Sequence, residues 1–179
     1  MDTARFFITY STQLLEREFL PRIRAVVETL TDEQVWWRPN EASNSIGNLI
    51  LHLSGNVNQW IVGGVGKQSV IRDRDREFDE RSPIPRAELL GKLEGTVSQA
   101  CSVLASLDPS MLAELREIRG NNVTVLEAIY HVVEHFSMHT GQILGLPGRI
   151  LICLAGVLVL VLSITGVIVW WRKLQARRA

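Results

Sequence analysis

One stretch that decides the fold is Tyr130-His131-Val132-Val133-Glu134-His135-Phe136-Ser137-Met138-His139-Thr140-Gly141-Gln142. It contains three of the four histidines of the chain, spaced four residues apart. On an α-helix, a step of four residues advances about 6 Å and turns about 40°, so the three imidazoles form one slanted stripe. Because two histidines at positions i and i+4 on one face can both reach a single divalent ion, the stretch is a candidate metal site.

The fourth histidine, His52, lies about 80 residues upstream in another apolar-periodic segment and is the candidate third ligand. Three neutral imidazoles with one open coordination position are typical of a catalytic rather than a structural metal site. A histidine is also often a half-buried core residue bonded to a carbonyl group. Spacing alone leaves both interpretations open.

Composition bounds the class of protein. The 179 residues are enough for one domain with a core plus an appendage. Lys and Arg balance Asp and Glu at 19 each, so we expect no nucleic-acid partner. Cys101 lies in an amphipathic segment and Cys153 in an apolar one, which predicts no disulfide between them. The first seven residues lack the basic start and sustained apolar run of a signal peptide.

Apolar periodicity predicts an all-α fold. The first helix is capped by Asp2 or Thr3 and is kinked or restarted at Pro21. The second runs from about residue 45 to 62 and the third from about 85 to 107. Thr124 to Glu127 reads as a capping box that opens the histidine helix, as Thr31 to Gln34 does for a short turn. The residues expected to face inward on the four helices are Phe6, Tyr10, Leu14, Phe19, Ile23, Val26, Val27 and Leu30; Ile46, Leu49, Ile50, Leu53, Val57, Trp60 and Ile61; Leu89, Leu93, Val97, Ala100, Cys101 and Leu104; Leu126, Ile129, Val133, Phe136, Thr140 and Ile143.

Two connections separate these helices. Gly63 to Gly66 end the second helix, and the next 20 residues are charged and irregular, which is typical of a lid or crossover. The alternating charges at 72–77 are expected to be solvated surface. Asn48 and Gln59 are likewise expected on a solvated helix edge. Residues 109–122 form the second connection, which ends in a turn at Gly120-Asn121-Asn122.

Helical phase separates the three clustered histidines. Measured from the middle of the inward arc, His139 lies about 70° away, His135 about 110° and His131 about 150°. His139 and His135 are therefore expected at the bundle edge. His131 is expected to face solvent, outside any metal site. Glu134 lies away from the histidine stripe and is expected at the surface, so no general base is identified.

Several patches together resemble the DinB-like superfamily, which includes the YfiT-type metal-dependent hydrolases. They are Trp36-Trp37-Arg38-Pro39, Ser43-Asn44-Ser45-Ile46-Gly47-Asn48-Leu49, His52-Leu53, Gln59-Trp60-Ile61 and His135-x-x-x-His139-Thr140-Gly141-Gln142. The likeness covers roughly residues 3 to 144.

This resemblance implies a four-helix bundle of the up-down-down-up type, with a long crossover, over residues 1–144. It also implies a divalent metal, Zn, Ni or similar, bound by His52, His135 and His139, which match the ligand positions of the superfamily. Some members are similar in fold to thiol S-transferases, so a low-molecular-weight thiol or another small molecule is the implied substrate. A homodimer is a further implied assembly.

The chain departs from this pattern after Gln142. Gly145 to Arg149 reads as a Gly/Pro hinge, and residues 150–171 follow with no charged side chain. Twenty-two residues span about 33 Å as a helix, which predicts a transmembrane helix followed by a basic tail at 172–179. The segment is similar to the last transmembrane helix of PepSY-associated membrane proteins.

These patterns predict a bundle held at a membrane by a single-pass C-terminal anchor. The four basic residues of the tail favour the cytoplasmic side for the tail, but an external bundle would have to cross the membrane without a signal peptide. We therefore expect a cytoplasmic bundle. Two functions stay open: a metal-dependent thiol S-transferase or hydrolase, and a non-catalytic membrane-anchored helical module whose histidines are structural or vestigial.

Overall fold

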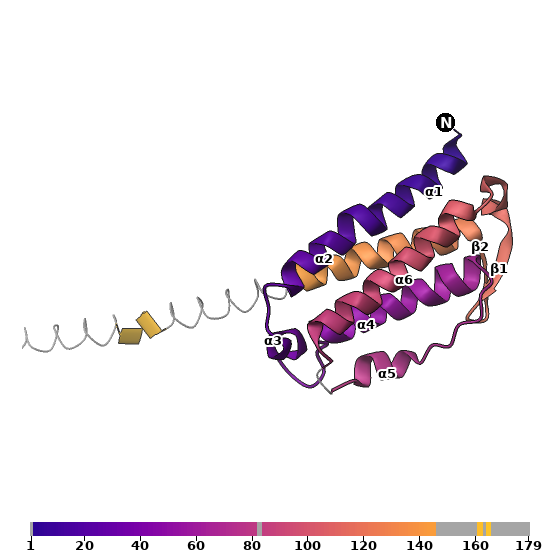
Figure 1. Cartoon of the computed structure of the whole chain (residues 1–179). Helices are drawn as coiled ribbons and strands as arrows, with labels where there is room; N and C mark the ends of the chain where they lie inside the picture. The colour runs from indigo at the N-terminus through magenta and orange to yellow at the C-terminus, as the bar shows by residue number, and fades with distance from the viewer. Residues whose placement is uncertain (1, 82–83, 146–160, 163, 166–179) are drawn as a thin grey trace, which may run out of the picture. The chain divides into compact units, whose positions relative to one another are not determined.

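Four long helical stretches run side by side in the described part of the chain (Figure 1). The computed structural model describes residues 2–81, 84–145, 161–162 and 164–165. The chain divides into two units, Met1–Leu144 and Gly145–Ala179, and the helices of interest all belong to the first. These helices comprise residues 3–27, 46–65, 86–106 and 125–145, the last ending one residue past the boundary.

The first stretch is one continuous helix with a π-helical segment in its middle: α1 (Thr3–Gln13), η1 (Leu14–Phe19) and α2 (Leu20–Val27). The wider turns precede Pro21, which has no N–H to donate to a regular ladder, so the helix continues through the proline. Its expected inward face is wrong in the first half, because Phe6 and Tyr10 are 54% and 50% exposed. The buried positions are Ile8, Ser11, Leu15, Ile23 and Val27.

The second stretch is the most deeply buried. A short α3 (Asp32–Trp36) with the predicted Thr31 capping box precedes it. The stretch itself comprises α4 (Ile46–Val57) and a π-helical η2 (Asn58–Val65). Ser45 and Asn48 form a second capping box at its start. Because every residue from 45 to 54 is buried, α4 is covered on all sides rather than on one face.

The charged connection supplies part of that cover. It contains α5 (Arg74–Asp79), which packs against α4, and it leads to α6 (Arg86–Ser106), which packs against α4 and η2. The predicted bounds of α6 are confirmed within one residue, as is the burial of Leu89, Leu93, Val97, Ala100 and Leu104. Cys101 is half-buried, and its burial raises the pKa of the thiol to about 11, consistent with a packing role.

A β-hairpin that the sequence reasoning missed fills the second connection. After η3 (Pro109–Ala113), strands β1 (Leu115–Ile118) and β2 (Asn121–Thr124) pair antiparallel. Their two-residue turn places Arg119 at φ 56° and Gly120 at φ 76°, the positive values that a type I′ hairpin turn requires. Thr124 then caps the helix of residues 125–145, and the Glu127 carboxylate accepts from the Thr124 N–H at 2.7 Å.

Contacts between helix ends define the directions of the helices. Arg5, near the start of α1, donates to the carbonyl of Leu107 at the end of α6 at 3.3 Å, so these two helices are antiparallel. The ring of Trp36 lies against Gly47 at the start of α4 and donates to the carbonyl of Ile84, just before α6, at 2.9 Å, so α4 and α6 start at the same end. Helices α4 and α6 therefore run parallel and need the long crossover between them (Figure 1).

The predicted transmembrane helix and membrane localisation need correction. Within the described part of the chain, no helix is both long enough and apolar enough to cross a membrane. The 21-residue α6 is interrupted by charges such as Lys92 and Glu94, and the apolar α4 has 12 residues. Of the expected span at 150–171, residues 161–162 and 164–165 are described and are helical; the rest of it, the hinge after Gly145 and the basic tail lie outside the described residues. The described part of the chain is therefore assigned a mostly helical fold, and the predicted transmembrane helix is not supported.

Candidate metal centre

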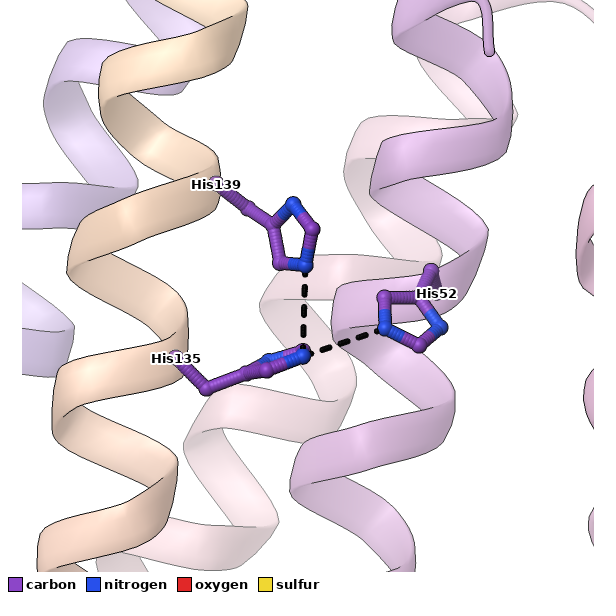
Figure 2. Close-up of side chains that lie close together, drawn as sticks. All are labelled: His52, His135 and His139. Atoms are coloured by element: carbon purple, nitrogen blue, oxygen red, sulfur yellow. Dashed lines mark hydrogen bonds between the residues drawn. The ribbon is translucent and has the colours of Figure 1, made fainter. Parts of the chain in front are cut away.

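Three histidines from two helices meet inside the bundle. His52 lies near the middle of α4, and His135 and His139 lie one turn apart on the helix of residues 125–145. In Figure 2 the three imidazoles point toward one another across the gap between these helices. The Nε2 atom of His135 is 3.1 Å from Nε2 of His52 and 3.2 Å from Nε2 of His139. One ligand atom from each histidine lies within 4.8 Å of those of the other two, so the group could hold one ion.

These separations match the dimensions of a metal site. Two nitrogens bound tetrahedrally at about 2.0–2.1 Å from one ion are roughly 3.4 Å apart. The two measured Nε2 separations of 3.1 and 3.2 Å are close to that value. Small shifts of the rings would therefore allow all three nitrogens to bind the same ion.

Hydrogen bonds on the far side of two rings orient their lone pairs. Nδ1 of His52 is 2.9 Å from a carboxylate oxygen of Glu77, and Nδ1 of His139 is 2.8 Å from the amide oxygen of Gln142. Nη2 of Arg72 also lies 3.2 Å from Nδ1 of His52, but it already donates to Glu77 at 2.8 Å, and the carboxylate oxygen is the nearer partner of the ring. Because both oxygens are acceptors, we assign the proton of each ring to Nδ1. This tautomer leaves the Nε2 lone pairs of His52 and His139 directed toward His135.

His135 cannot satisfy both neighbours by itself. A proton on its Nε2 can point well toward one of the two lone pairs, and its own Nδ1 is buried without a hydrogen-bond partner among the described residues. A cation placed among the three Nε2 atoms would accept all three lone pairs at once. The donor set of three imidazoles therefore fits a divalent metal of the Zn or Ni type.

The surroundings of His135 and His139 also favour the neutral imidazole, which is the form that binds metals. Burial, together with the nearby His139 and His52, lowers the pKa of His135 to about 3. Burial lowers the pKa of His139 as well, although its bond to Gln142 opposes the shift. Near neutral pH both side chains are therefore ready to donate a lone pair.

Acid should destabilise the metal-free chain for the same reason. The pKa values of His131, His135 and His139 all lie below the ordinary value of 6.5, so the unfolded chain takes up protons that the folded chain refuses. The contribution of these neutral histidines to the free energy of unfolding is therefore complete above about pH 6.5. It is lost as the pH falls toward about 3. Urea unfolding with a chelator present should show a loss between about pH 7 and pH 5, above the range in which most carboxylates titrate. A constant or rising stability over that interval would contradict the assigned surroundings.

A second layer of the site comes from the connection that was expected to be solvated surface. The side chains of Arg72 and Glu77 are only 4% and 10% exposed. Arg72 donates from Nε and Nη2 to the two oxygens of Glu77 at 2.7 and 2.8 Å, and from Nη1 to the amide oxygen of Gln59 at 2.9 Å. Burial alone would raise the pKa of Glu77, but its bonds to Arg72 and His52 outweigh this and lower it. The expectation for this charged run is therefore wrong at two positions.

Asn48 also differs from its expectation. It is fully buried instead of lying on a solvated edge. Its amide nitrogen donates to the carbonyl of Glu77 at 2.9 Å, and its amide oxygen accepts from Arg38 at 2.6 Å. Asn48 therefore ties the end of the crossover to α4. The signal that was available in the sequence was the capping-box pairing of Asn48 with Ser45.

His131 lies outside the group of three, as its helical phase predicts. It is half-buried rather than solvent-facing, because its ring packs on Trp60 with centroids 4.2 Å apart. Nδ2 of Asn56 lies 3.3 Å from Nε2 of His131. This nitrogen is thus turned toward α4 and is engaged there.

A cavity of about 400 Å³ lies next to the second layer. It shares Arg72, Glu77 and Gly55 with that layer and reaches α6 at Lys92 and Thr96, but none of the histidines lines it. The imidazole nitrogens, and not this cavity, are therefore the candidate reactive centre.

Comparisons with known proteins agree with this fold. Residues 4–151 match a family described as protein of unknown function (DUF1572). A conserved protein from Enterococcus faecalis superposes with a TM-score of 0.61 at 16% identity, covering 76% of this chain and 92% of that one. A DinB-like protein from Bacillus cereus superposes with a TM-score of 0.56 at 15% identity, covering 77% and 86%. These likenesses show a DinB-like fold, and no curated protein matches the chain.

Proposed function

Because the chain belongs to the DUF1572 family, whose function is unknown, we propose from the site itself that the protein binds one divalent metal ion through His52, His135 and His139. The observation that carries the proposal is the convergence of three Nε2 atoms, two of which have their lone pairs oriented by Glu77 and Gln142. Burial of the His135 and His139 imidazoles, which lowers their pKa values, supports it, since neutral ligands need no proton removed at neutral pH.

The proposed activity is a metal-dependent thiol S-transferase or hydrolase. Three imidazole ligands leave a position open, and an ion bound there would lower the pKa of a water or thiol at that position. Imidazole suits Zn, Ni and related ions alike, so we propose the class of ion and not one element. A low-molecular-weight thiol or another small molecule as substrate, and a second copy of the chain as partner, remain predictions.

A non-catalytic metal-binding module is the second candidate. It is favoured because two carboxylates near the histidines, Glu77 in space and Glu134 in sequence, are poorly placed to act as a base. Glu77 is already bonded to both Arg72 and His52, and Glu134 is exposed, so neither is placed as a free general base. Both candidates bind a metal ion at the three histidines, and they differ in whether the bound ion catalyses a reaction.

Elemental analysis of the full chain tests the shared part of the proposal. After loading with Zn²⁺ or Ni²⁺ and exhaustive dialysis, we expect about one equivalent of metal per chain, as one three-histidine site implies. A chain that retains no metal would contradict metal binding. With metal restored, turnover in thiol-transfer or hydrolase assays supports the enzyme, and stoichiometric metal without turnover favours the non-catalytic module.

A further inference from the structure

Gly55 creates a notch in the most buried helix of the bundle. It lies on α4, three residues after His52. A Cβ atom at this position would overlap the carboxylate oxygen Oε1 of Glu77 and lie 2.8 Å from Nε of Arg72. Any larger residue would therefore displace the pair. A glycine inside a helix weakens it, so its presence calls for a reason such as this close approach.

The notch admits a carboxylate that is bound from two sides. One oxygen of Glu77 accepts from Nε of Arg72 at 2.7 Å. The other accepts from Nη2 of Arg72 at 2.8 Å and from Nδ1 of His52 at 2.9 Å. Because the guanidinium fork fixes the plane of the carboxylate, the second oxygen is aimed at the imidazole. The chain from Arg72 through Glu77 to His52 is therefore geometrically determined.

We propose that Glu77, fixed by Arg72 and admitted by Gly55, is a positioning residue of the metal centre that determines which nitrogen of His52 faces the ion. The inference rests on the proposed function and deepens it. With the proton of His52 on Nδ1, the Nε2 lone pair is free, 3.1 Å from Nε2 of His135. A carboxylate behind a ligating histidine also makes that ligand more basic and strengthens metal binding. The crossover between α4 and α6 is then part of the metal centre.

A purely structural role for the same ion pair leads to different results. In that case Arg72 and Glu77 would only dock the crossover onto α4, and their loss would lower stability without a selective effect on metal affinity. A glycine-to-alanine change in a helix ordinarily stabilises it. A positioning role predicts a change in metal affinity and in the tautomer of His52. A purely structural role predicts only a change in the stability of the metal-free chain.

The first test compares two single-charge removals in the full chain. Glu77→Gln keeps the size of the side chain but removes the charge, and Asp75→Asn removes a charge from an exposed residue of the same short helix. Zn²⁺ affinity is measured by competition with a chromophoric chelator, and the tautomer of His52 by long-range ¹H–¹⁵N NMR of the metal-free chain. We expect Glu77→Gln to bind zinc about 10–100-fold more weakly and to lose the pure Nδ1–H tautomer. Asp75→Asn should match the wild type in both.

The second test uses the notch itself. Gly55→Ala should expel Glu77 and weaken Zn²⁺ binding to the same extent as Glu77→Gln. Gly95→Ala is the matched control, since that glycine lies in α6 and no atom of the part of the chain that the structure describes lies within 4 Å of an added Cβ. It should raise the melting temperature and leave zinc affinity unchanged. Combining Gly55→Ala with Glu77→Gln should cause little further loss, because both changes remove the same interaction.

The outcomes separate this inference from the metal site as a whole. Wild-type zinc affinity in both Glu77→Gln and Gly55→Ala would overturn the positioning role and leave the three-histidine site standing. A wild-type chain that binds no zinc would remove the proposed function and this inference together. If Glu77→Gln does not fold, Arg72→Lys replaces it, since lysine keeps the charge but loses the fork that orients the carboxylate. That variant should also bind zinc more weakly, and unchanged affinity would count against the inference.

Discussion

His135→Ala should abolish stoichiometric metal binding. Its Nε2 atom is within 3.1 and 3.2 Å of the Nε2 atoms of the two other histidines, so its loss leaves two imidazoles without their shared neighbour. Loss of a residue that merely supports a ligand already costs about 10–100-fold in metal affinity, so loss of the ligand itself should cost more than 100-fold. Isothermal titration with Zn²⁺ and elemental analysis after dialysis measure the effect.

His131→Ala is the matched control on the same helix. His131 lies one turn away and is half-buried, but it is outside the group of three. Its variant should retain the full equivalent of metal. Because the ring packs on Trp60, some loss of stability is expected there, in contrast to the silent change that a solvent-facing residue would give. Equal metal loss in both variants would contradict the assignment of ligands.

Phe136→Ala should have the largest effect on stability. The side chain is fully buried and stacks on Phe19 of η1, with ring centroids 6.0 Å apart. Truncating a buried phenylalanine removes apolar contact and leaves a cavity, which costs about 3–5 kcal/mol. Urea unfolding of the metal-free chain measures the change in free energy and separates it from any contribution of a bound ion.

Tyr130→Ala provides the comparison for this second change. Tyr130 belongs to the same helix and is also aromatic, but its side chain is 60% exposed. We expect it to cost much less than Phe136→Ala, since most of its surface stays in water in the folded chain. If the two costs were reversed, the helical phase would be wrong, and the orientation of His135 and His139 would be wrong with it.

Local signals in the sequence predicted the parts of the fold that depend on neighbouring residues. The capping boxes at Thr31 and Thr124 form as predicted, because each needs residues three positions apart. The burial of Phe136 and the exclusion of His131 follow from helical phase on a long helix. Histidine spacing made His52 a candidate third ligand, but its proximity to His139 was supported mainly by the family resemblance, since no local pattern relates helices so far apart in sequence.

In the first half of the first helix, the face that helical spacing predicted to be buried is the exposed one. Phe6 and Tyr10 lie on the exposed arc and stack on each other, with centroids 5.8 Å apart. The smaller Ile8 and Leu15 face the core. Leu126 was misplaced as well and is 43% exposed, while its neighbour Val125 is fully buried. Which arc faces the core is decided by the partner helices, which the periodicity of one segment does not contain.

The burial of the charged crossover was predicted wrongly at two positions, because its run of charges contains both solvated residues and one buried ion pair. Alternating Arg and Asp residues are typical of solvated surface, and most residues of the run are exposed. Arg72 and Glu77 are exceptions because of two residues on the preceding helical stretch. Gly55 leaves space for the carboxylate of Glu77, and Gln59 accepts a hydrogen bond from Arg72. The hairpin was missed for a related reason: its strands have four residues each, too short for an alternating pattern to emerge.

The separation of His52 and His135 by 83 residues has a thermodynamic consequence for the whole bundle. In the unfolded chain, bringing His52 to the other two histidines costs the entropy of closing this long loop, whereas the native fold already holds all three together. An ion that binds the native state far better than the unfolded one shifts the folding equilibrium by mass action. At a free metal concentration about 100 times the dissociation constant, this linkage adds roughly 2.7 kcal/mol to the free energy of unfolding. Metal supply would then regulate how much of the protein is folded, as well as how much of it is loaded.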